Sequence, residues 1–504
     1  MSAQLAARFE RIFERFLDAL TPDEAASVAA ELIGSGLTFD EAKRRLSRGR
    51  PYSRAVATGV THTSHEMDGQ RFYYTLDVPT GYDPSRSYPV RVHLHGGVTA
   101  REDNRQRAPD GIGALATGED QIYILPDSWV DAPWWTGVQV ANLRAILDAT
   151  KRTYNVDENR VSVSGVSDGG TGAFYLAMRD PTPYASYVSL IGFLLALATR
   201  ILGVRDELFP NNLINRAFFV VNGGLDPLYP TSMVDPVIRY LRNGGVDVEN
   251  RPLPTAGHDL RWWPDLREAI EQFVRQHPRA PLPSTLSWQR GTDDPFLRAH
   301  WLIIDQLRPA DDVAMLPDVN VIATPATLRF GVQIADTRVT RVLPDSAAAA
   351  LEVRAGDEIL MVNDETVAQS LDIVKALDRC CRAGGRVRLR VSRNGRSVEL
   401  EGVADARTTF GPTVPLFPRR RPNGRVDLVK TGNTVRASTS GVAEYTLLLS
   451  PDAFDFAEPI LVITNGKLSF SGRVEPSLAT LLRWAAVDND RTALFGVELH
   501  ITVD

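Results

Sequence analysis

A serine flanked by small residues stands in the segment Gly165-Val166-Ser167-Asp168-Gly169. The residues VSVS before it are typical of a strand, and the stretch from Ala173 to Met178 is typical of a helix. Gly-x-Ser-x-Gly at a strand-to-helix turn is the nucleophile elbow, in which small neighbours let the backbone turn sharply and leave the serine hydroxyl accessible. The motif predicts Ser167 as a nucleophile, although a turn alone does not require chemistry.

A serine hydroxyl is a weak nucleophile at neutral pH, so it needs a base that removes its proton during attack. Two later loops can supply one: Asp226 follows the apolar strand 218–221, and His258 follows a further strand. We predict that His258 accepts the proton and returns it to the leaving group, while Asp226 orients the imidazole and stabilises its charged form. All three residues follow strand ends, where parallel sheets place their ligands.

Other histidines and aspartates are less well placed for these roles. They lie in a predicted helix or at its end, next to the predicted base, or outside the predicted catalytic domain. These alternatives are His277, His300, His500, Asp235 and Asp259.

A glycine-containing loop follows another apolar strand. Residues 90–94 end in His95-Gly96-Gly97, a loop type that offers a backbone N–H to a developing oxyanion. We predict the N–H groups of Gly97 and Asp168 as the two donors of an oxyanion hole. His95 is expected to support this loop.

Aromatic residues lie in the loop after a neighbouring strand. Trp134 and Trp135 can form a platform for an acyl or sugar group, and with His95 they are the candidate substrate-binding residues; packing is an equally open interpretation. His93 and His95 share one face of a strand, which is compatible with a metal pair. No third ligand accompanies them, so we expect no metal site.

Short apolar strands alternate with helices between about residues 70 and 275. This rhythm predicts an α/β fold with a mostly parallel, doubly wound sheet covered by helices on both faces. The chain order Ser, Asp, His is the order expected for an α/β-hydrolase.

The remaining chain is long enough for further domains, since 504 residues correspond to about three domains at roughly 150 residues each. Composition shifts and Pro-rich stretches set the predicted boundaries. They are an N-terminal helical segment 1–50, a catalytic domain 51–280, connecting strands 281–317, a strand-rich module 318–405, a Pro/Arg linker 406–424 and a C-terminal β-rich domain 425–504.

The composition is that of an ordinary globular protein, with 43% hydrophobic and 23% charged residues. A formal charge of −6 does not favour nucleic-acid binding. The longest apolar run, residues 191–199, is too short for a membrane span. The adjacent Cys380 and Cys381 are expected to be free thiols. Without an apolar signal segment at the N-terminus we expect a cytoplasmic protein, or a secreted one if a leader was removed.

The stretch from about 70 to 275 resembles serine esterases of the α/β-hydrolase superfamily, in the branch of acetyl xylan and feruloyl esterases, polyhydroxybutyrate depolymerases and predicted peptidases. The matching segments are LHGG at 94–97, GVSDGG at 165–170, NGGLDP at 222–227 and AGHD at 256–259. This resemblance implies hydrolysis of a small-molecule or polymer ester through an acyl-enzyme, without a metal or organic cofactor. The oxyanion loop differs from that of many lipases, which have a third glycine where this chain has Val98.

Residues 318–405 resemble a PDZ domain of the bacterial type often attached to proteases, on the segments RFGV at 329–332 and VTRVLPDSAAAALEVRAGDEILMVND at 339–364. Such domains bind an extended C-terminal peptide as an added strand. By analogy Phe330, Gly331 and Val332 line that groove; a PDZ fold that only packs against the catalytic domain is an equally open interpretation.

The tail resembles a β module found beyond the hydrolase in bacterial relatives, on TLLLSPDAFDF at 446–456 and LLRWAAVDNDRT at 481–492. Strand-like runs at 285–307 lead to the hypothesis that this module begins before the PDZ-like domain, which would then be an insertion in it.

These features predict a serine carboxylesterase for short-chain or aromatic acyl groups. Two alternatives stay open: a serine peptidase of the prolyl-oligopeptidase kind, and a PDZ scaffold with a relict hydrolase core. The sequence also leaves a homo-oligomer open.

Overall fold

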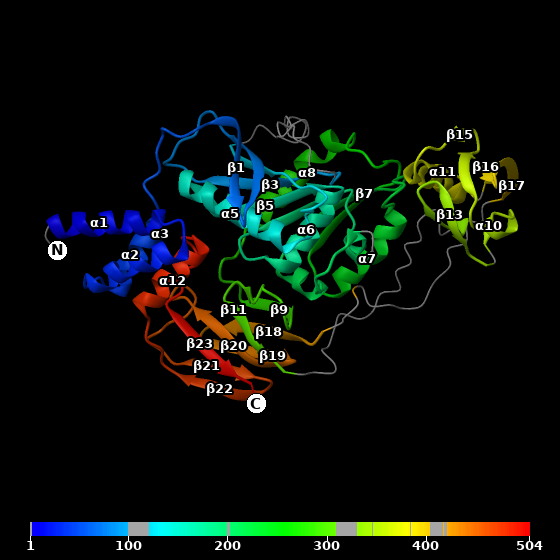
Figure 1. Cartoon of the computed structure of the whole chain (residues 1–504). Helices are drawn as coiled ribbons and strands as arrows, with labels where there is room; N and C mark the ends of the chain where they lie inside the picture. Colours follow the sequence, from blue (N-terminus) through cyan, green and yellow to red (C-terminus); the bar gives the residue numbers. More distant parts are fainter. Residues whose placement is uncertain are drawn as a thin grey trace.

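A computed structural model gives the arrangement of the chain (Figure 1). It describes residues 3–98, 120–198, 202–308, 330–344, 346–383, 385–403, 417 and 421–503. A central α/β domain lies between a group of N-terminal helices on one side and the PDZ-like domain on the other, with a β module beside it.

The central sheet has eight strands in the order β1-β2-β4-β3-β5-β6-β7-β8. β2 pairs antiparallel with β1 and β4, and the strands from β4 to β8 pair in parallel. This order is that of the α/β-hydrolase fold, so the predicted fold class is confirmed. The strands are β1 Gly59–Met67, β2 Gln70–Val78, β3 Tyr88–Leu94, β4 Ile122–Pro126, β5 Val156–Val166, β6 Ser186–Leu190, β7 Ala217–Gly223 and β8 Val248–Leu253.

Both faces of this sheet are buried under helices. Because strand side chains alternate, Phe218 and Val220 of β7 join one hydrophobic core with α5, α6 and α7, while Phe219 and Val221 join another with α8. The helical segments of this domain are α5 Gly137–Thr153, α6 Asp168–Arg179, η1 Leu194–Ala198, η3 Pro210–Asn215, α7 Thr231–Asn243 and α8 Trp263–Gln276.

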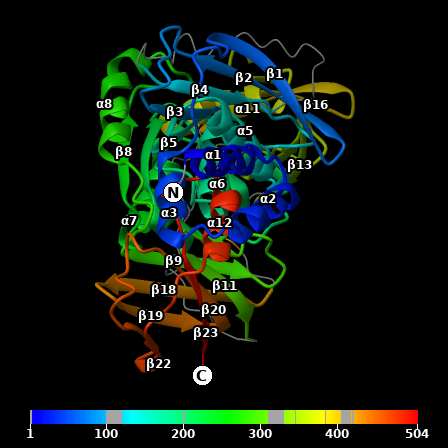
Figure 2. The ribbon, with the colours of Figure 1, turned by 90° about the vertical axis from the view of Figure 1, so that its left-hand side faces the viewer.

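Three helices precede the sheet, and a helix from the far end of the chain packs among them (Figure 2). Thr21 and Glu24 form a capping box that starts the second of them, and Thr38 and Glu41 start the third in the same way. Their apolar faces share one core with Leu481 and residues near it. The helices are α1 Ala3–Asp18, α2 Pro22–Gly34, α3 Phe39–Arg48 and α12 Leu478–Asp488.

The β module is built from both sides of the PDZ-like domain. β9 pairs with β18, and β11 pairs with β20. Two sheets, β10-β11-β20-β23 and β22-β21-β19-β18-β9, share one hydrophobic core, so the chain enters the PDZ-like domain from this module and returns to it. Its strands are β9 Thr285–Gly291, β10 Arg298–Ala299, β11 Leu302–Leu307, β18 Asn423–Thr431, β19 Thr434–Ser440, β20 Val442–Leu449, β21 Ile460–Thr464, β22 Lys467–Gly472 and β23 Val497–Thr502.

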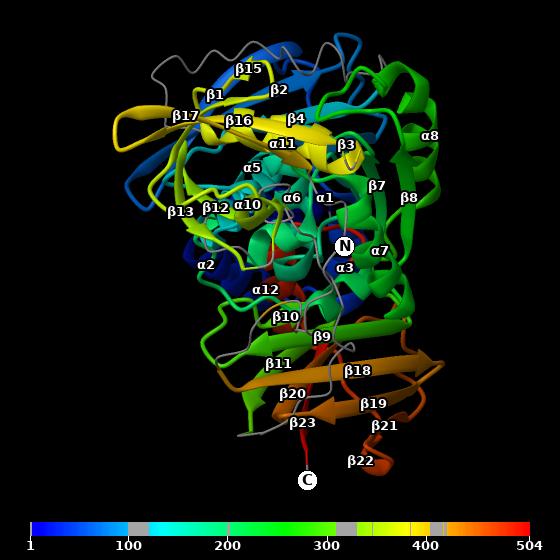
Figure 3. The same ribbon diagram turned by 90° about the vertical axis from the view of Figure 1, so that its right-hand side faces the viewer.

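The PDZ-like domain has its own core and a sheet in the order β12-β13-β14-β16-β17, with β15 paired to β14 (Figure 3). β12 lies at the edge of this sheet. Its elements are β12 Val332–Ala335, β13 Arg338–Val342, α10 Ala347–Ala350, β14 Glu358–Val362, β15 Glu365–Thr366, α11 Ser370–Ala383, β16 Arg386–Arg393 and β17 Arg396–Val403. Cys380 is a buried free thiol.

Buried ion pairs join the β module to the catalytic domain. The Arg279 guanidinium donates to Asp490 Oδ2 at 2.6 Å and to Asn159 Oδ1 at 3.0 Å. Both charged side chains of this pair are nearly inaccessible, at 2% and 4%. Burial alone would raise the pKa of Asp490, but Arg279 and Lys151 hold it well below its usual range.

We expect Arg279→Met to lower the midpoint of thermal unfolding by several degrees, since removing one partner of a buried pair costs about 3–5 kcal/mol. The exposed Arg160, which faces Asp157 at 3.6 Å, is the control: Arg160→Met should change stability by less than about 1 kcal/mol. Because the pKa of Asp490 is depressed, its contribution is present above the usual carboxyl pKa and is lost as the pH falls. The difference between Arg279→Met and wild type should therefore shrink in acid, as followed by circular dichroism; equal midpoints at pH 7 would contradict this role.

Candidate active site

Ser167 stands on a strained turn between β5 and α6. Its backbone has φ 53° and ψ −114°, which a residue with a side chain adopts rarely. The turn closes tightly because its neighbours are glycines: a Cβ on Gly165 would lie 2.1 Å from the carbonyl oxygen of Gly169, and one on Gly169 would lie 2.0 Å from that of Leu94. The Gly-x-Ser-x-Gly pattern is thus required by backbone contacts on both sides of the serine.

Ser167, His258 and Asp226 are connected by two hydrogen bonds. Ser167 Oγ lies 2.9 Å from His258 Nε2, and His258 Nδ1 lies 2.7 Å from Asp226 Oδ2. When Nδ1–H donates to the carboxylate, Nε2 is left as the acceptor for the serine hydroxyl. This is the arrangement that nucleophilic attack by a serine requires.

Asp226 is fully buried, and its two oxygens have separate tasks. Oδ1 accepts the backbone N–H groups of Leu228 at 2.8 Å and Tyr229 at 3.0 Å, while Oδ2 faces His258. These donors hold the carboxylate in place and offset the cost of burying its charge. The Tyr229 ring meets the His258 imidazole edge-on at 5.9 Å between centroids. The sequence analysis did not predict Tyr229 as part of the site. Its position three residues after Asp226 was the only feature that could have indicated it.

The loops carrying the acid and the base touch through their backbones. Leu225 N donates to the Ala256 carbonyl oxygen at 2.8 Å. A Cβ on Gly223 would lie 2.3 Å from that same oxygen, and one on Gly224 would lie 2.4 Å from the Pro254 oxygen. The pair of glycines in NGGLDP therefore lets the two loops approach closely enough for the His258–Asp226 hydrogen bond.

The predicted oxyanion loop lies against the nucleophile. A Cβ on Gly96 would lie 3.1 Å from Ser167 Cβ, and Gly97 has a φ of 64°. The Asp168 side chain accepts the N–H of Val98 at 2.9 Å. The carboxylate of the residue after the nucleophile therefore fixes the end of this loop, a contact that the sequence did not predict.

His95 forms hydrogen bonds that connect this loop to the segment after β4. Its Nδ1 lies 2.9 Å from the Gly96 oxygen, its Nε2 accepts Ser128 N–H at 3.0 Å, and its own carbonyl oxygen accepts Trp134 Nε1–H at 2.9 Å. Trp134 and Trp135 are 2% and 6% exposed and belong to the hydrophobic core. In this structure the two tryptophans pack, and their indoles do not present an open platform.

His93 points into a different environment from His95. It is buried, its Nδ1 lies 3.0 Å from Ser164 Oγ, and burial together with the neighbouring Arg91 lowers its pKa to about 3. Within the residues that the structure describes, no group of three or more His, Cys, Asp or Glu side chains gathers as a metal site would require.

Of the described helices, none is both long and apolar enough to cross a membrane.

In the PDZ-like domain, Phe330 and Val332 have fully buried side chains. Gly331 has a φ of 100° and packs so closely on Ser346 that a Cβ would lie 2.1 Å from the serine Cβ. The side chains of Phe330 and Val332 therefore belong to the core of this domain, and Ile334 is the half-buried side chain of β12.

Comparisons with known proteins find similarities in two parts of the chain. A PDZ domain family model matches residues 306–401. The chain is 24% identical over 183 residues to feruloyl esterase C of Emericella nidulans, covering 33% of this chain and 67% of that protein. It is 21% identical over 203 residues to "Probable feruloyl esterase C" of Aspergillus terreus, covering 39% and 70%.

Two solved structures match part of the chain. One is a thermostable esterase, at 20% identity and a TM-score of 0.36, covering 44% of this chain and 63% of that one. The other is a ferulic acid esterase, at 19% identity and a TM-score of 0.32, covering 43% and 98%.

The predicted resemblance to esterases of the α/β-hydrolase fold, joined to a PDZ domain, is confirmed by the sequence similarities, and so is the broad class of carboxylic ester hydrolase.

We expect Gly224→Ala to lower kcat/KM for p-nitrophenyl acetate about 100-fold, because its Cβ pushes the acid loop away from the loop of His258 and a shift of about 1 Å costs that much. Gly81→Ala is the matched control, since its Cβ would meet open space. Both variants should remain folded by circular dichroism. Unchanged activity of Gly224→Ala would show that the close approach of the two loops is not needed.

Proposed function

We propose that this chain is a serine esterase that cleaves carboxylic esters through an acyl-enzyme on Ser167. The observation that carries the proposal is the unbroken hydrogen-bond path from Ser167 Oγ through His258 to the buried Asp226. Such a chain of hydrogen bonds lets a neutral serine hydroxyl transfer its proton to the histidine as the oxygen attacks.

In the first half of the reaction Ser167 Oγ attacks the ester carbonyl carbon, and His258 Nε2 takes the hydroxyl proton. The carbonyl oxygen becomes an oxyanion, for which the N–H groups of Gly97 and Asp168 are the proposed donors. The imidazolium then gives its proton to the leaving alkoxide, and the alcohol departs. In the second half a water molecule, activated by His258, attacks the acyl-enzyme and releases the carboxylic acid.

Aromatic or short acyl groups are the proposed substrates, as parts of small or polymeric esters. The similarity to two proteins named feruloyl esterases supports the aromatic choice. The buried Trp134 and Trp135 do not add to it, so the acyl group is proposed to lie against other surfaces near Ser167. A panel of p-nitrophenyl esters of rising chain length, together with methyl ferulate, tests this; preference for long chains would contradict it.

We expect Ser167→Ala to lower kcat for p-nitrophenyl acetate by about 10³-fold or more, since removing the nucleophile removes the covalent route. A fluorophosphonate probe should label wild type and fail to label the variant. Retained hydrolysis in a folded Ser167→Ala variant would refute the nucleophile, and cleavage of peptide amides without esters would favour the peptidase alternative. Absence of both labelling and hydrolysis in wild type would favour a relict core.

A second proposed activity is peptide binding by the PDZ-like domain. Among the residues that the structure describes, β12 pairs with β13 alone and forms the edge of its sheet, so its other side is the proposed place for an added strand. The family match to residues 306–401 supports this role. A peptide carboxylate would be held by backbone N–H groups of the Phe330–Val332 turn.

Fluorescence anisotropy with peptides ending in apolar residues tests the binding. We expect free C-termini to bind at least tenfold more tightly than the same peptides with amidated ends, because amidation removes the charge that the N–H groups hold. Ile334→Arg should weaken binding without affecting esterase activity. Equal affinity for both peptide forms would contradict carboxylate recognition.

A further inference from the structure

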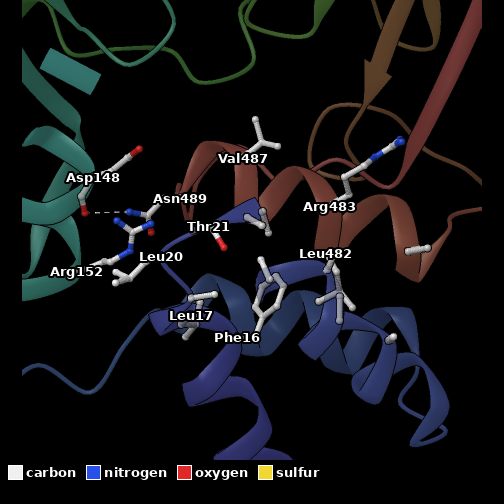
Figure 4. A pocket seen from close by; sticks show the side chains of 18 of the residues that line it. Phe16, Leu17, Leu20, Thr21, Asp148, Arg152, Leu482, Arg483, Val487 and Asn489 are labelled. Atoms are coloured by element: carbon white, nitrogen blue, oxygen red, sulfur yellow. Dashed lines mark hydrogen bonds between the residues drawn. The ribbon is translucent and has the colours of Figure 1, made fainter. Parts of the chain in front are cut away.

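A cavity of about 500 Å³ opens where the N-terminal helices, α12 and the end of α5 meet (Figure 4). This volume is within the range of about 300–1,000 Å³ found for small-molecule sites. α5 has 17 residues, so it is about 25 Å long. The cavity contacts the C-terminal end of α5, at Asp148 and Arg152. The N-terminal end of α5 follows Trp134, which donates to His95 in the loop beside Ser167. The cavity therefore lies far from Ser167 along this helix.

The walls of the cavity are mainly apolar. They include Phe16 and Leu17 of α1 and Leu482 of α12 (Figure 4). Three of its lining residues are large apolar side chains that are unusually exposed, namely Leu20 at 73%, Ile33 at 45% and Val487 at 52%. An apolar chain lying along these residues would remove their surface from water, which favours binding.

One end of the cavity is polar and is lined by charged side chains. Arg50 and Arg152 lie there with Asp148, whose pKa is raised by burial. Arg152 has no hydrogen bond or ion pair to any residue that the structure describes, and its Nε is buried. The Nε of Arg50 is also buried without a hydrogen bond, although it faces Asp18 Oδ1 at 3.6 Å. The other two nitrogens of this guanidinium donate to Asn489 Oδ1 at 2.9 Å and to the Leu17 carbonyl oxygen.

The third lining arginine has a different setting. Arg483 forms an ion pair with Glu498, and Figure 4 shows it pointing away from the cavity. A buried Nε–H without a hydrogen bond therefore remains on Arg50 and on Arg152, and both lie at the same end. A buried N–H without an acceptor is costly, and a carboxylate is the group that satisfies two such donors best.

We propose that this cavity binds an amphiphile with a single carboxylate and an unbranched apolar chain. The carboxylate lies at Arg152 and Arg50, and the chain runs between α1, α2 and α12. The rival occupant, an apolar segment of a second copy of this chain, covers Leu20 and Val487 but brings no carboxylate to the two guanidinium groups. The site is distinct from the proposed catalytic centre and does not depend on its activity.

Isothermal titration calorimetry of the full chain with decanoate tests this proposal. We expect saturable binding of decanoate, at least tenfold weaker binding of 1-decanol, and no binding of acetate. Arg152→Ala should weaken decanoate binding about tenfold by removing the charge-assisted hydrogen bond. Arg160→Ala, another arginine of the same domain, is the control and should bind as wild type. Equal affinities of wild type and Arg152→Ala would overturn the proposal.

A second variant tests the apolar part without removing any core side chain. Ala26 lines the cavity and is exposed, so Ala26→Trp should fill the groove while the protein stays folded. We expect this variant to lose decanoate binding and keep hydrolysis of p-nitrophenyl acetate. Undiminished decanoate binding would place the ligand elsewhere. Sedimentation velocity distinguishes the rival: a dimer that Ala26→Trp disrupts, with no decanoate effect, would identify a second copy as the occupant.

Discussion

The close backbone contact between the loops after β7 and β8 is the constraint on which the geometry of the candidate active site depends. Asp226 is fully buried, so its charge must be held by donors that cannot move away. Two backbone N–H groups and the His258 imidazole supply them, and the imidazole reaches the carboxylate only because Gly223 and Gly224 have no side chains. One structural feature thus determines both the stability of a buried charge and the direction in which His258 faces Ser167.

The same reasoning extends to Ser167, the proposed nucleophile on the other side of the imidazole. Ser167 holds a strained backbone conformation that persists because β5, α6 and the oxyanion loop fix it from three sides. Asp168 contributes twice, since its backbone begins α6 and its carboxylate accepts Val98 N–H. The Asp168 carboxylate lies near the proposed oxyanion site and accepts a hydrogen bond there. This hydrogen bond reduces the repulsion between the carboxylate and the negative charge that develops on the substrate oxygen.

The three residues of the site were predictable from the sequence, because each follows a strand end in a short motif and their order along the chain is informative. What the sequence did not reveal depends on contacts between distant segments. Trp134 and Trp135 lie in a loop that sequence reasoning treats as accessible, but the indole of Trp134 donates to His95 and packs on Gly172, whose missing side chain makes room for it. The pairing of α12 with the N-terminal helices joins segments more than 400 residues apart, and no local pattern specifies such a contact.

The position of α12 makes the accessory parts of the chain a continuous support for the catalytic domain. α12 lies between β22 and β23 of the β module and ends at Asp488, which pairs with Arg298, while Asp490 just beyond it pairs with Arg279. The same helix forms one wall of the cavity whose polar end is on α5. A ligand that pushed α12 away from α5 would have to strain these buried ion pairs, whereas one that fills the existing space leaves them intact. The ion pairs therefore favour a preformed cavity, and a preformed site loses less free energy to ordering when a ligand binds.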